Sequence, residues 1–169
     1  MKRLQTKSTK GLVVIAVVSL FIAFLMMAWP YLLSNWDSTK NDQGSYLNLG
    51  LDIKDRVRLT DGARNPFLPL ILSLFASHEW SYFTLAKLLC LGIALLSLAT
   101  LLYLDSKLFD LKIALLSVTL TALNADFLRT TSTRVRSEAF LTLFLVLAVY
   151  FWYEGLRKDQ IKLFALAGA

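Results

Sequence analysis

Long apolar stretches separated by short polar ones are the dominant pattern of this chain. The first stretch, residues 11–36, contains no charged side chain. A helix of about 20 apolar residues crosses the roughly 30 Å of hydrocarbon in a bilayer, so the pattern predicts a membrane span over about residues 11–33. The stretch is too long for the core of a secretory signal, and no small-residue cleavage site follows it, which favours a signal anchor.

Later apolar stretches predict further spans at about residues 80–104, 111–125 and 138–155, and a fifth begins at residue 163. The strictly apolar parts of the third and fourth cover only about 20–23 Å at 1.5 Å of rise per residue, less than the bilayer core. The polar segment 126–138 between them is therefore expected at membrane depth, buried in protein or lining a wet cavity. Local thinning of the bilayer is the alternative explanation.

Residues 34–79 form a polar interval and predict an outer loop. Within it, the segment 66–77 is too short to span and begins with a proline, which is typical of an interfacial or re-entrant helix. Asp42 and Tyr46 lie four residues apart, on one face if this part of the loop is helical. We expect a short amphipathic helix here that lies on the membrane, buries Tyr46 and leaves Asp42 at its start.

Composition narrows the class of protein. The chain is 56% hydrophobic and 18% charged, whereas soluble domains have about 45–50% apolar and about 25% charged residues. These values argue against a soluble globular fold and rule out disorder. The single cysteine and single histidine exclude a disulfide framework and a metal centre built on several such residues. We predict an all-α integral membrane protein: a multi-span helical bundle in which residues 1–169 form one transmembrane domain, with an outer loop that carries short interfacial helices.

Basic residues flank the apolar stretches, so the net charge of +6 points to the membrane and not to nucleic acid. The Lys and Arg cluster within residues 2–10 predicts a cytoplasmic N-terminus for a multi-pass protein of the cell membrane. Lys87 interrupts the second predicted span near its outer end, where its stem can snorkel towards the interface. Aromatic residues at the far end of the first span are expected at the outer interface: Trp29, Tyr31 and Trp36.

The cations on the predicted inner side are mostly Lys, whereas those on the outer side are mostly Arg. Arg presents a planar fork of donors that fits phosphate or carboxylate in a bidentate manner. Arginines placed against the topological bias indicate an anionic ligand on the outer side, and ion pairs with aspartates of the same loop are the alternative. The arginines concerned are Arg56, Arg58, Arg64, Arg129, Arg134 and Arg136.

Three motifs occur in order on the predicted outer side: DQGSY at 42–46, RNPFLP at 64–69 and RSE at 136–138. By spacing alone, Asp42 is either a helix N-cap, where Asp is favoured, or a catalytic carboxylate. In their order and spacing, over about residues 10–169, the motifs resemble the start of the GT-C glycosyltransferases of the protein mannosyltransferase and aminoarabinose transferase type. Gln43 stands where that family usually has a second carboxylate.

The resemblance implies a lipid-linked sugar donor and an acceptor, whether protein, glycan or lipid, handled on the outer face of the membrane. Asp42 is then the catalytic base, with inversion at the sugar carbon. The candidate substrate-binding residues are Tyr46, Arg64, Arg134, Arg136 and Glu138. The arginines of this set would neutralise the leaving phosphate, and Glu138 would orient the acceptor or hold a divalent cation. Such a cation is compatible with the motifs but not required, because the carboxylate pair at residues 42–43 is incomplete.

Chains of this family are several hundred residues long, so the resemblance also implies the N-terminal part of a longer protein, inactive by itself. Two other classes of function stay open. One is a small multi-span scaffold without chemistry, and the other is a transporter fragment whose arginines bind an anionic substrate. A transporter is expected to have repeats and broken spans. The sequence has no internal repeat, and Pro30 is the one proline within a predicted span.

Overall fold

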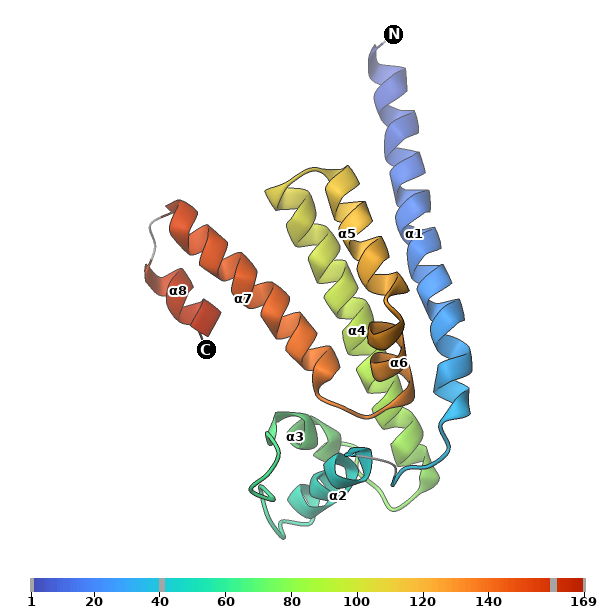
Figure 1. Ribbon diagram of the computed structural model, residues 1–169, viewed down its shortest axis with the longest axis vertical. Coiled ribbons are helices and arrows are strands. Elements are labelled where there is room, and N and C mark those ends of the chain that lie inside the picture. Colours follow the sequence, from blue (N-terminus) through green and yellow to red (C-terminus); the bar gives the residue numbers. More distant parts are fainter. Residues whose placement is uncertain (1, 40–41, 159–160, 169) are drawn as a thin grey trace.

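The computed structural model describes residues 2–39, 42–158 and 161–168, and the regular structure in these ranges is entirely helical (Figure 1). Helices α1, α4 and α7 are long and apolar enough to cross a membrane, and the bent pair of α5 and α6 would make a fourth span. The prediction of a multi-span helical membrane protein is therefore confirmed. The helices are α1 (Lys2–Ser34), α2 (Gln43–Lys54), α3 (Phe67–Ser73), α4 (Trp80–Leu108), α5 (Leu111–Leu123), α6 (Ala125–Thr133), α7 (Glu138–Lys158) and α8 (Ile161–Gly168).

Helix α4 forms the centre of the bundle. Helices α5, α6 and α7 pack against it, and α1 packs against α5 and α6. Figure 1 shows α7 leaning away from α4 towards its C-terminal end, where α8 folds back beside it. Alanines are fully buried where helices meet, for example Ala28 in α1, Ala94 in α4 and Ala122 in α5. Such small side chains let helix backbones approach closely, which is how membrane bundles usually pack.

The polar segment 126–138 is helical up to Thr133. Helix α5 ends at Leu123, and α6 begins at Ala125 after a bend of 61°. The Asn124 side chain accepts a hydrogen bond from the backbone N–H of Phe127 at 2.8 Å and so caps the start of α6. The hydroxyls along α6 donate back to carbonyls of their own helix, as Thr131 Oγ1 does to Phe127 O at 2.7 Å. The side-chain hydroxyls of this polar segment therefore find hydrogen-bond partners within a helix, which the hydropathy pattern did not predict.

Helices α2 and α3 form a unit at the end of the bundle opposite the N-terminus (Figure 1). Their apolar faces meet around Leu47, Leu68 and Leu72, and Tyr82 of α4 donates from Oη to the carbonyl oxygen of Leu47 at 3.1 Å. The expected interfacial helix over 66–77 is shorter than predicted, because α3 ends at Ser73.

Lys87 does not snorkel to the surface, contrary to the expectation from sequence. The residue is 5% exposed, and its Nζ donates to the carbonyl oxygens of Leu32 at 2.8 Å and Asn35 at 2.9 Å. Its ammonium also lies 4.6 Å from the centre of the Phe83 ring. The last carbonyls of a helix lack partners within that helix and attract cations. Lys87 therefore caps the C-terminal end of α1 from α4.

Candidate functional site

Arg64 joins two carboxylates at the end of the molecule formed by α2 and α3. Its Nη1 donates to Asp61 Oδ2 at 2.7 Å and its Nη2 to Asp42 Oδ1 at 3.1 Å. Asp61 also accepts from the backbone N–H groups of Ala63 and Arg64. The Ala63 N–H bond and then the Arg64 guanidinium lower the pKa of Asp61 to about 2, while Asp61 and then Asp42 raise the pKa of Arg64. The turn at 61–64 thus presents Arg64 to Asp42.

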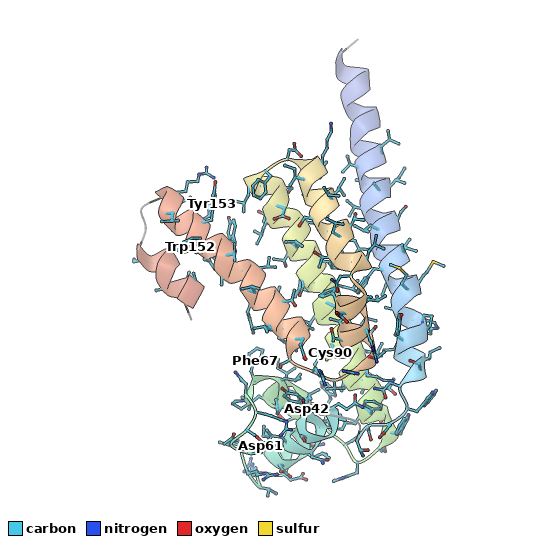
Figure 2. The ribbon with its side chains drawn as sticks, in the orientation of Figure 1. Asp42, Asp61, Phe67, Cys90, Trp152 and Tyr153 are labelled. Atoms are coloured by element: carbon cyan, nitrogen blue, oxygen red, sulfur yellow. The ribbon has the colours of Figure 1, made fainter. Side chains whose placement is uncertain are left out.

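Asp42 immediately precedes α2, but its side chain forms no capping hydrogen bond to that helix. Its carboxylate is 60% exposed and pairs with Arg64 instead. The sequence left two interpretations of Asp42 open, a helix N-cap and a catalytic carboxylate. The side-chain N-cap is not formed. Figure 2 shows Asp42 and Asp61 on the same end of the molecule, below the start of α7. An exposed carboxylate held by one guanidinium can still approach a ligand.

Tyr46 links the Arg64 cluster to the beginning of α7. Its ring centre lies 5.9 Å from the Arg64 guanidinium carbon, and its hydroxyl lies 3.2 Å from Ser137 Oγ. Ser137 stands between Arg136 and Glu138, and Arg136 Nη1 donates to Glu138 Oε1 at 3.2 Å. The Arg136–Glu138 pair adjoins the other contacts because both residues are chain neighbours of Ser137. We call the whole group the Asp42 cluster: Asp42, Tyr46, Asp61, Arg64, Arg136, Ser137 and Glu138.

Five of the six residues selected from the sequence thus come together in the Asp42 cluster. Asp61 and Ser137 are the members that sequence reasoning did not select. The spacing of Asp61 and Arg64, with Gly62 between them, is typical of an Asp-initiated turn and could have indicated the first. Ser137 lies inside the RSE motif, but nothing in its sequence pattern indicates Tyr46 as its partner.

The Asp42 cluster contains three carboxylates and two guanidiniums, so its formal charge is negative. The Nε of Arg136 is buried and has no hydrogen-bond partner among the described residues. A buried donor without a partner is rare in proteins, and an oxygen of a bound ligand or water would satisfy it. The cluster therefore offers carboxylate oxygens that can accept from ligand hydroxyls and, at Arg136 Nε, a donor for a ligand oxygen.

An apolar pocket of about 750 Å³ adjoins the cluster. Asn65 and Ser137 line it at the cluster, and rings from α3 and α7 line the rest: Phe67, Phe140, Phe144 and Phe151. The Phe67 ring makes edge contacts with Phe140 at 5.4 Å and Phe144 at 5.3 Å between ring centres. Residues of α8 complete the wall. This pocket has the chemistry to take a hydrocarbon chain.

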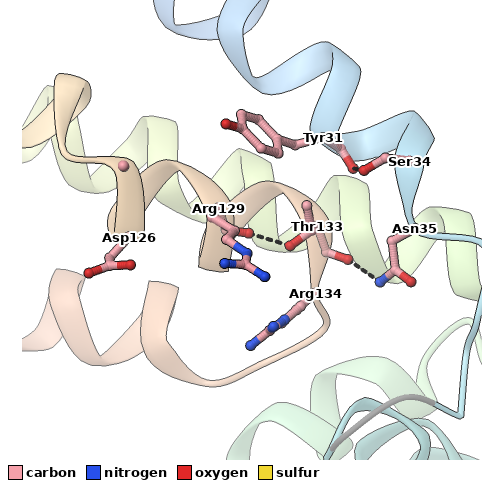
Figure 3. Close-up of a pocket in the computed structure, with 8 residues that line it drawn as sticks. Tyr31, Ser34, Asn35, Asp126, Arg129, Thr133 and Arg134 are labelled. Atoms are coloured by element: carbon pink, nitrogen blue, oxygen red, sulfur yellow. Dashed lines mark hydrogen bonds between the residues drawn. The ribbon is translucent and has the colours of Figure 1, made fainter.

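Arg134, the sixth predicted site residue, lines a different pocket. That pocket, of about 460 Å³, lies between the end of α1 and helix α6, and Arg129 and Asp126 line it as well (Figure 3). Within residues 2–39, 42–158 and 161–168, no hydrogen bond or ion pair joins Arg134 to a member of the Asp42 cluster.

Gln43 is buried, and its side-chain amide is held by hydrogen bonds within the protein. Its Oε1 accepts from Asn35 Nδ2 at 3.1 Å, and its Nε2 donates to the carbonyl oxygen of Asp37. This side chain uses both a donor and an acceptor, whereas an ionised carboxylate offers acceptors only. No three residues among His, Cys, Asp and Glu gather into a metal-binding group in the part of the chain that the structure describes.

The molecule is a multi-span helical membrane protein, because several of its helices have membrane-spanning length. The polar cluster at one end of the bundle and the apolar pocket beside it form a candidate site for an amphiphilic ligand. The sequence model of the family described as dolichyl-phosphate-mannose-protein mannosyltransferase matches residues 66–169, and the chain belongs to this family. The match confirms the resemblance to the GT-C glycosyltransferases. Neither a curated protein nor a solved structure matches the chain.

The matched region begins at Pro66, so it divides the candidate residues into two groups. Arg134, Arg136 and Glu138 lie inside it, whereas Asp42 and Arg64 lie before it. The contacts through Tyr46 and Ser137 therefore connect the earlier loop to the region that carries the family match.

Proposed function

We propose that the chain takes part in moving a sugar from a polyprenyl-phosphate donor to an acceptor hydroxyl on the outer face of the membrane. One observation carries this proposal: Arg64 pairs with the exposed Asp42 carboxylate and lies beside Tyr46, and the Tyr46 hydroxyl contacts Ser137. Ser137 stands between Arg136 and Glu138, in the region of the family match. The broken pair of α5 and α6 would also suit a transporter. Family membership favours transfer chemistry.

Asp42 supplies the general base. It takes the proton of the acceptor hydroxyl while that oxygen forms a bond to the anomeric carbon of the sugar. The bond from that carbon to the phosphate oxygen breaks, and its electron pair stays on the released polyprenyl phosphate. Attack opposite the leaving group inverts the sugar carbon. Arg64 holds the carboxylate in position until the acceptor hydroxyl arrives, through the hydrogen bond from its Nη2 to Asp42 Oδ1 at 3.1 Å.

The leaving phosphate gains charge as the bond breaks, and guanidiniums stabilise that charge. Arg136 is suited to this role, since none of the described residues accepts a hydrogen bond from its Nε–H. Tyr46, which contacts Ser137, and Glu138, the next residue in the chain, orient the acceptor or donor sugar. The apolar pocket along α7 accommodates the start of the polyprenyl tail. Glu138 is also the carboxylate that a divalent cation would use, if the reaction employs one.

Asp42→Asn tests the proposal. The amide is nearly isosteric but accepts no proton at neutral pH, and general-base assistance is typically worth about 10²–10⁴ in rate. With the protein produced from its complete reading frame and reconstituted in proteoliposomes, we expect transfer to fall by about that factor while donor binding is retained. Asp52→Asn is the matched control, because Asp52 also pairs with an arginine, Arg58 at 2.6 Å, but lies outside the cluster. Near-normal turnover of Asp42→Asn would reject Asp42 as the base, and Glu138 would be the next candidate.

We also infer a cytoplasmic N-terminus, from the cations that precede the first span, and location in the cell membrane. The two ends of α4 then lie on opposite sides of the bilayer, the α2–α3 end outside. Single cysteines introduced as Arg58→Cys and Lys107→Cys in a Cys90→Ala background separate the alternatives. An impermeant maleimide added to intact cells should label position 58 and not position 107. The reverse pattern would invert the topology.

A further inference from the structure

A small pocket of about 220 Å³ lies on one face of α2, and we call it the Trp80 pocket. Residues 38–39, one face of α2 and residues 77–80, 82 and 83 line it. The α2 positions are 44, 47, 48 and 51, a spacing of three and four residues that defines a single side of a helix. Tyr46 is not among them, and its hydroxyl contacts Ser137 instead. Among the described residues that line the pocket, none belongs to the Asp42 cluster, so the two are separate places on α2.

Two stacked tryptophans form the aromatic wall of the Trp80 pocket. Trp80, the first residue of α4, lines the pocket and stacks on Trp36, with 6.2 Å between ring centres and 10° between ring planes. Phe83 makes an edge contact with the Trp80 ring at 5.4 Å between ring centres. Despite these contacts, Trp36 is 65% exposed and Trp80 is 49% exposed. A place at the membrane interface accounts for exposed tryptophans. It does not account for their parallel arrangement beside a polar cavity.

The rim of the Trp80 pocket is polar but carries little charge. The polar side chains that line it are Ser38, Thr39, Asn48, Ser77, His78 and Glu79. Hydroxyl, amide and neutral imidazole groups both donate and accept hydrogen bonds, and Glu79 adds one carboxylate that only accepts. No lysine or arginine lines the pocket in the part of the chain that the structure describes. A phosphate would therefore find neither a guanidinium nor an ammonium group here.

Contacts between the lining segments hold the walls of the Trp80 pocket in place. Lys54, at the end of α2, donates to the carbonyl oxygen of Ala76, just before the lining residues 77–80. Tyr82 Oη donates to the carbonyl oxygen of Leu47 at 3.1 Å and so ties α4 to α2. On the third side the chain packs directly on α2, since a Cβ at position 44 would lie 3.1 Å from Thr39 Cα. The pocket is thus enclosed by packed backbone and not by loose side chains alone.

We propose that the Trp80 pocket binds one pyranose ring of an uncharged saccharide. One face of such a ring consists of C–H groups, which the electron-rich face of an indole attracts, while its edge carries hydroxyls that both donate and accept. Trp80 offers the aromatic surface, and the polar rim offers the hydrogen-bond partners. Sites for drug-sized ligands have about 300–1,000 Å³, so the smaller volume suits a single ring. The site goes beyond the proposed transfer reaction, whose reacting groups meet at the Asp42 cluster, and does not depend on it.

Saturation-transfer difference NMR on the protein, produced as for the transfer assay, tests the site. The detergent is octaethylene glycol monododecyl ether, because maltoside and glucoside detergents carry sugars themselves. The probes are methyl β-D-glucopyranoside and methyl α-D-mannopyranoside, and sorbitol is the matching polyol without a ring. At least one glycoside should receive saturation, most strongly at its ring C–H protons, and sorbitol should not. Absence of transfer to both glycosides, or equal transfer to sorbitol, would overturn the proposal.

An organic cation is the alternative occupant, because aromatic rings beside a carboxylate also attract ammonium groups. Tetramethylammonium is the probe for this alternative in the same experiment. It should receive no saturation that Trp80→Ala removes. Binding of tetramethylammonium at this site in place of the glycosides would overturn the proposal and identify a cation site.

Trp80→Ala should weaken glycoside binding by about tenfold or more, because the stacking surface is lost. Trp80→Phe keeps a smaller aromatic ring and should bind with intermediate strength, so the test does not rest on Trp80→Ala alone. Trp29→Ala is the matched control, because Trp29 is an exposed tryptophan near the end of α1, outside the pocket. Wild-type affinity in Trp80→Ala, or an equal loss in Trp29→Ala, would overturn the site. Asp42→Asn should leave this binding unchanged, so failure here is separate from failure of the transfer proposal.

Discussion

Lys87 of α4 donates from its buried ammonium to the carbonyl oxygen of Leu32, in the last turn of α1, at 2.8 Å. A second hydrogen bond reaches the carbonyl oxygen of Asn35. These bonds end α1 at the point where the chain turns towards Asp42. The side chain of Asn35 then contacts both Gln43, which follows Asp42 in the chain, and Thr133, which lines the pocket between α1 and α6. One buried cation therefore helps to position the residue next to Asp42 and one wall of that pocket.

Lys87→Met should lower the stability of the protein. Methionine fills a similar volume but leaves the carbonyl oxygens of Leu32 and Asn35 without their donor, which costs about 1–3 kcal/mol for a buried group. Thermal unfolding in detergent should show a lower midpoint for this variant. Lys107→Met is the control, because Lys107 is an exposed lysine of the same helix. Equal midpoints for Lys87→Met and wild type would indicate that the α1 carbonyls find other partners.

Gln43→Glu restores the second carboxylate that is usual in the family, yet we expect it to destabilise the protein. The Gln43 amide donates to Asp37 O and accepts from Asn35, and a carboxylate would face the Asp37 carbonyl without a proton to donate. The expected loss is about 1–3 kcal/mol in the free energy of unfolding, measured with and without Mg²⁺ or Mn²⁺. Asn48→Asp, on the exposed face of α2, controls for the added charge. Rescue of Gln43→Glu by a divalent cation would contradict this expectation and indicate a metal site at residues 42–43.

Gly50→Ala should loosen the α2–α3 unit. A Cβ at this position would overlap the Tyr82 hydroxyl and lie 3.1 Å from Leu72 Cβ, so the hydrogen bond from Tyr82 to Leu47 must shift. Overpacking of this kind typically costs about 1–3 kcal/mol. Gly92→Ala in α4 is the matched control, because nothing lies within 4 Å of its Cβ position. We expect a lower unfolding midpoint for Gly50→Ala alone, and similar midpoints for the two variants would refute the close packing of α2.

The lowered pKa of Asp61 predicts that the folded protein loses stability in acid. Its folded pKa of about 2 lies below the ordinary value of 3.8, so the charged form stabilises the folded state above about pH 4. This contribution is lost as the pH falls from 3.8 towards 2, because the unfolded chain takes up the proton in that range while the folded protein does not until its own pKa is reached. Unfolding midpoints of wild type and Asp61→Ala should therefore differ at neutral pH and converge across that range. A difference that stays constant down to pH 2 would show that the charge of Asp61 is not what holds the turn.

The sequence by itself determined the class of fold. The length of an apolar stretch is a local property of the sequence. A stretch that crosses the bilayer forms a helix, because every backbone polar group in the hydrocarbon must find a partner within the segment. The ranges 11–33, 80–104 and 138–155 accordingly fall inside α1, α4 and α7. The motif around Arg136 and Glu138 could also be found from sequence, because its residues are adjacent in the chain. It lies in the region of the family match.

The tertiary structure decided which polar residues act together. Hydropathy identifies Lys87 and residues 126–133 as polar. Whether these side chains are exposed or buried depends on hydrogen-bond partners distant in sequence, such as Leu32 for Lys87. Likewise Arg134 and Arg136 stand two residues apart, yet one lines the pocket of α1 and α6 while the other pairs with Glu138. Tyr46 meets Ser137 across 91 positions of sequence. Such contacts depend on how the helices pack and on which backbone donors and acceptors lack a partner within their own helix. Neither can be predicted from a local sequence pattern.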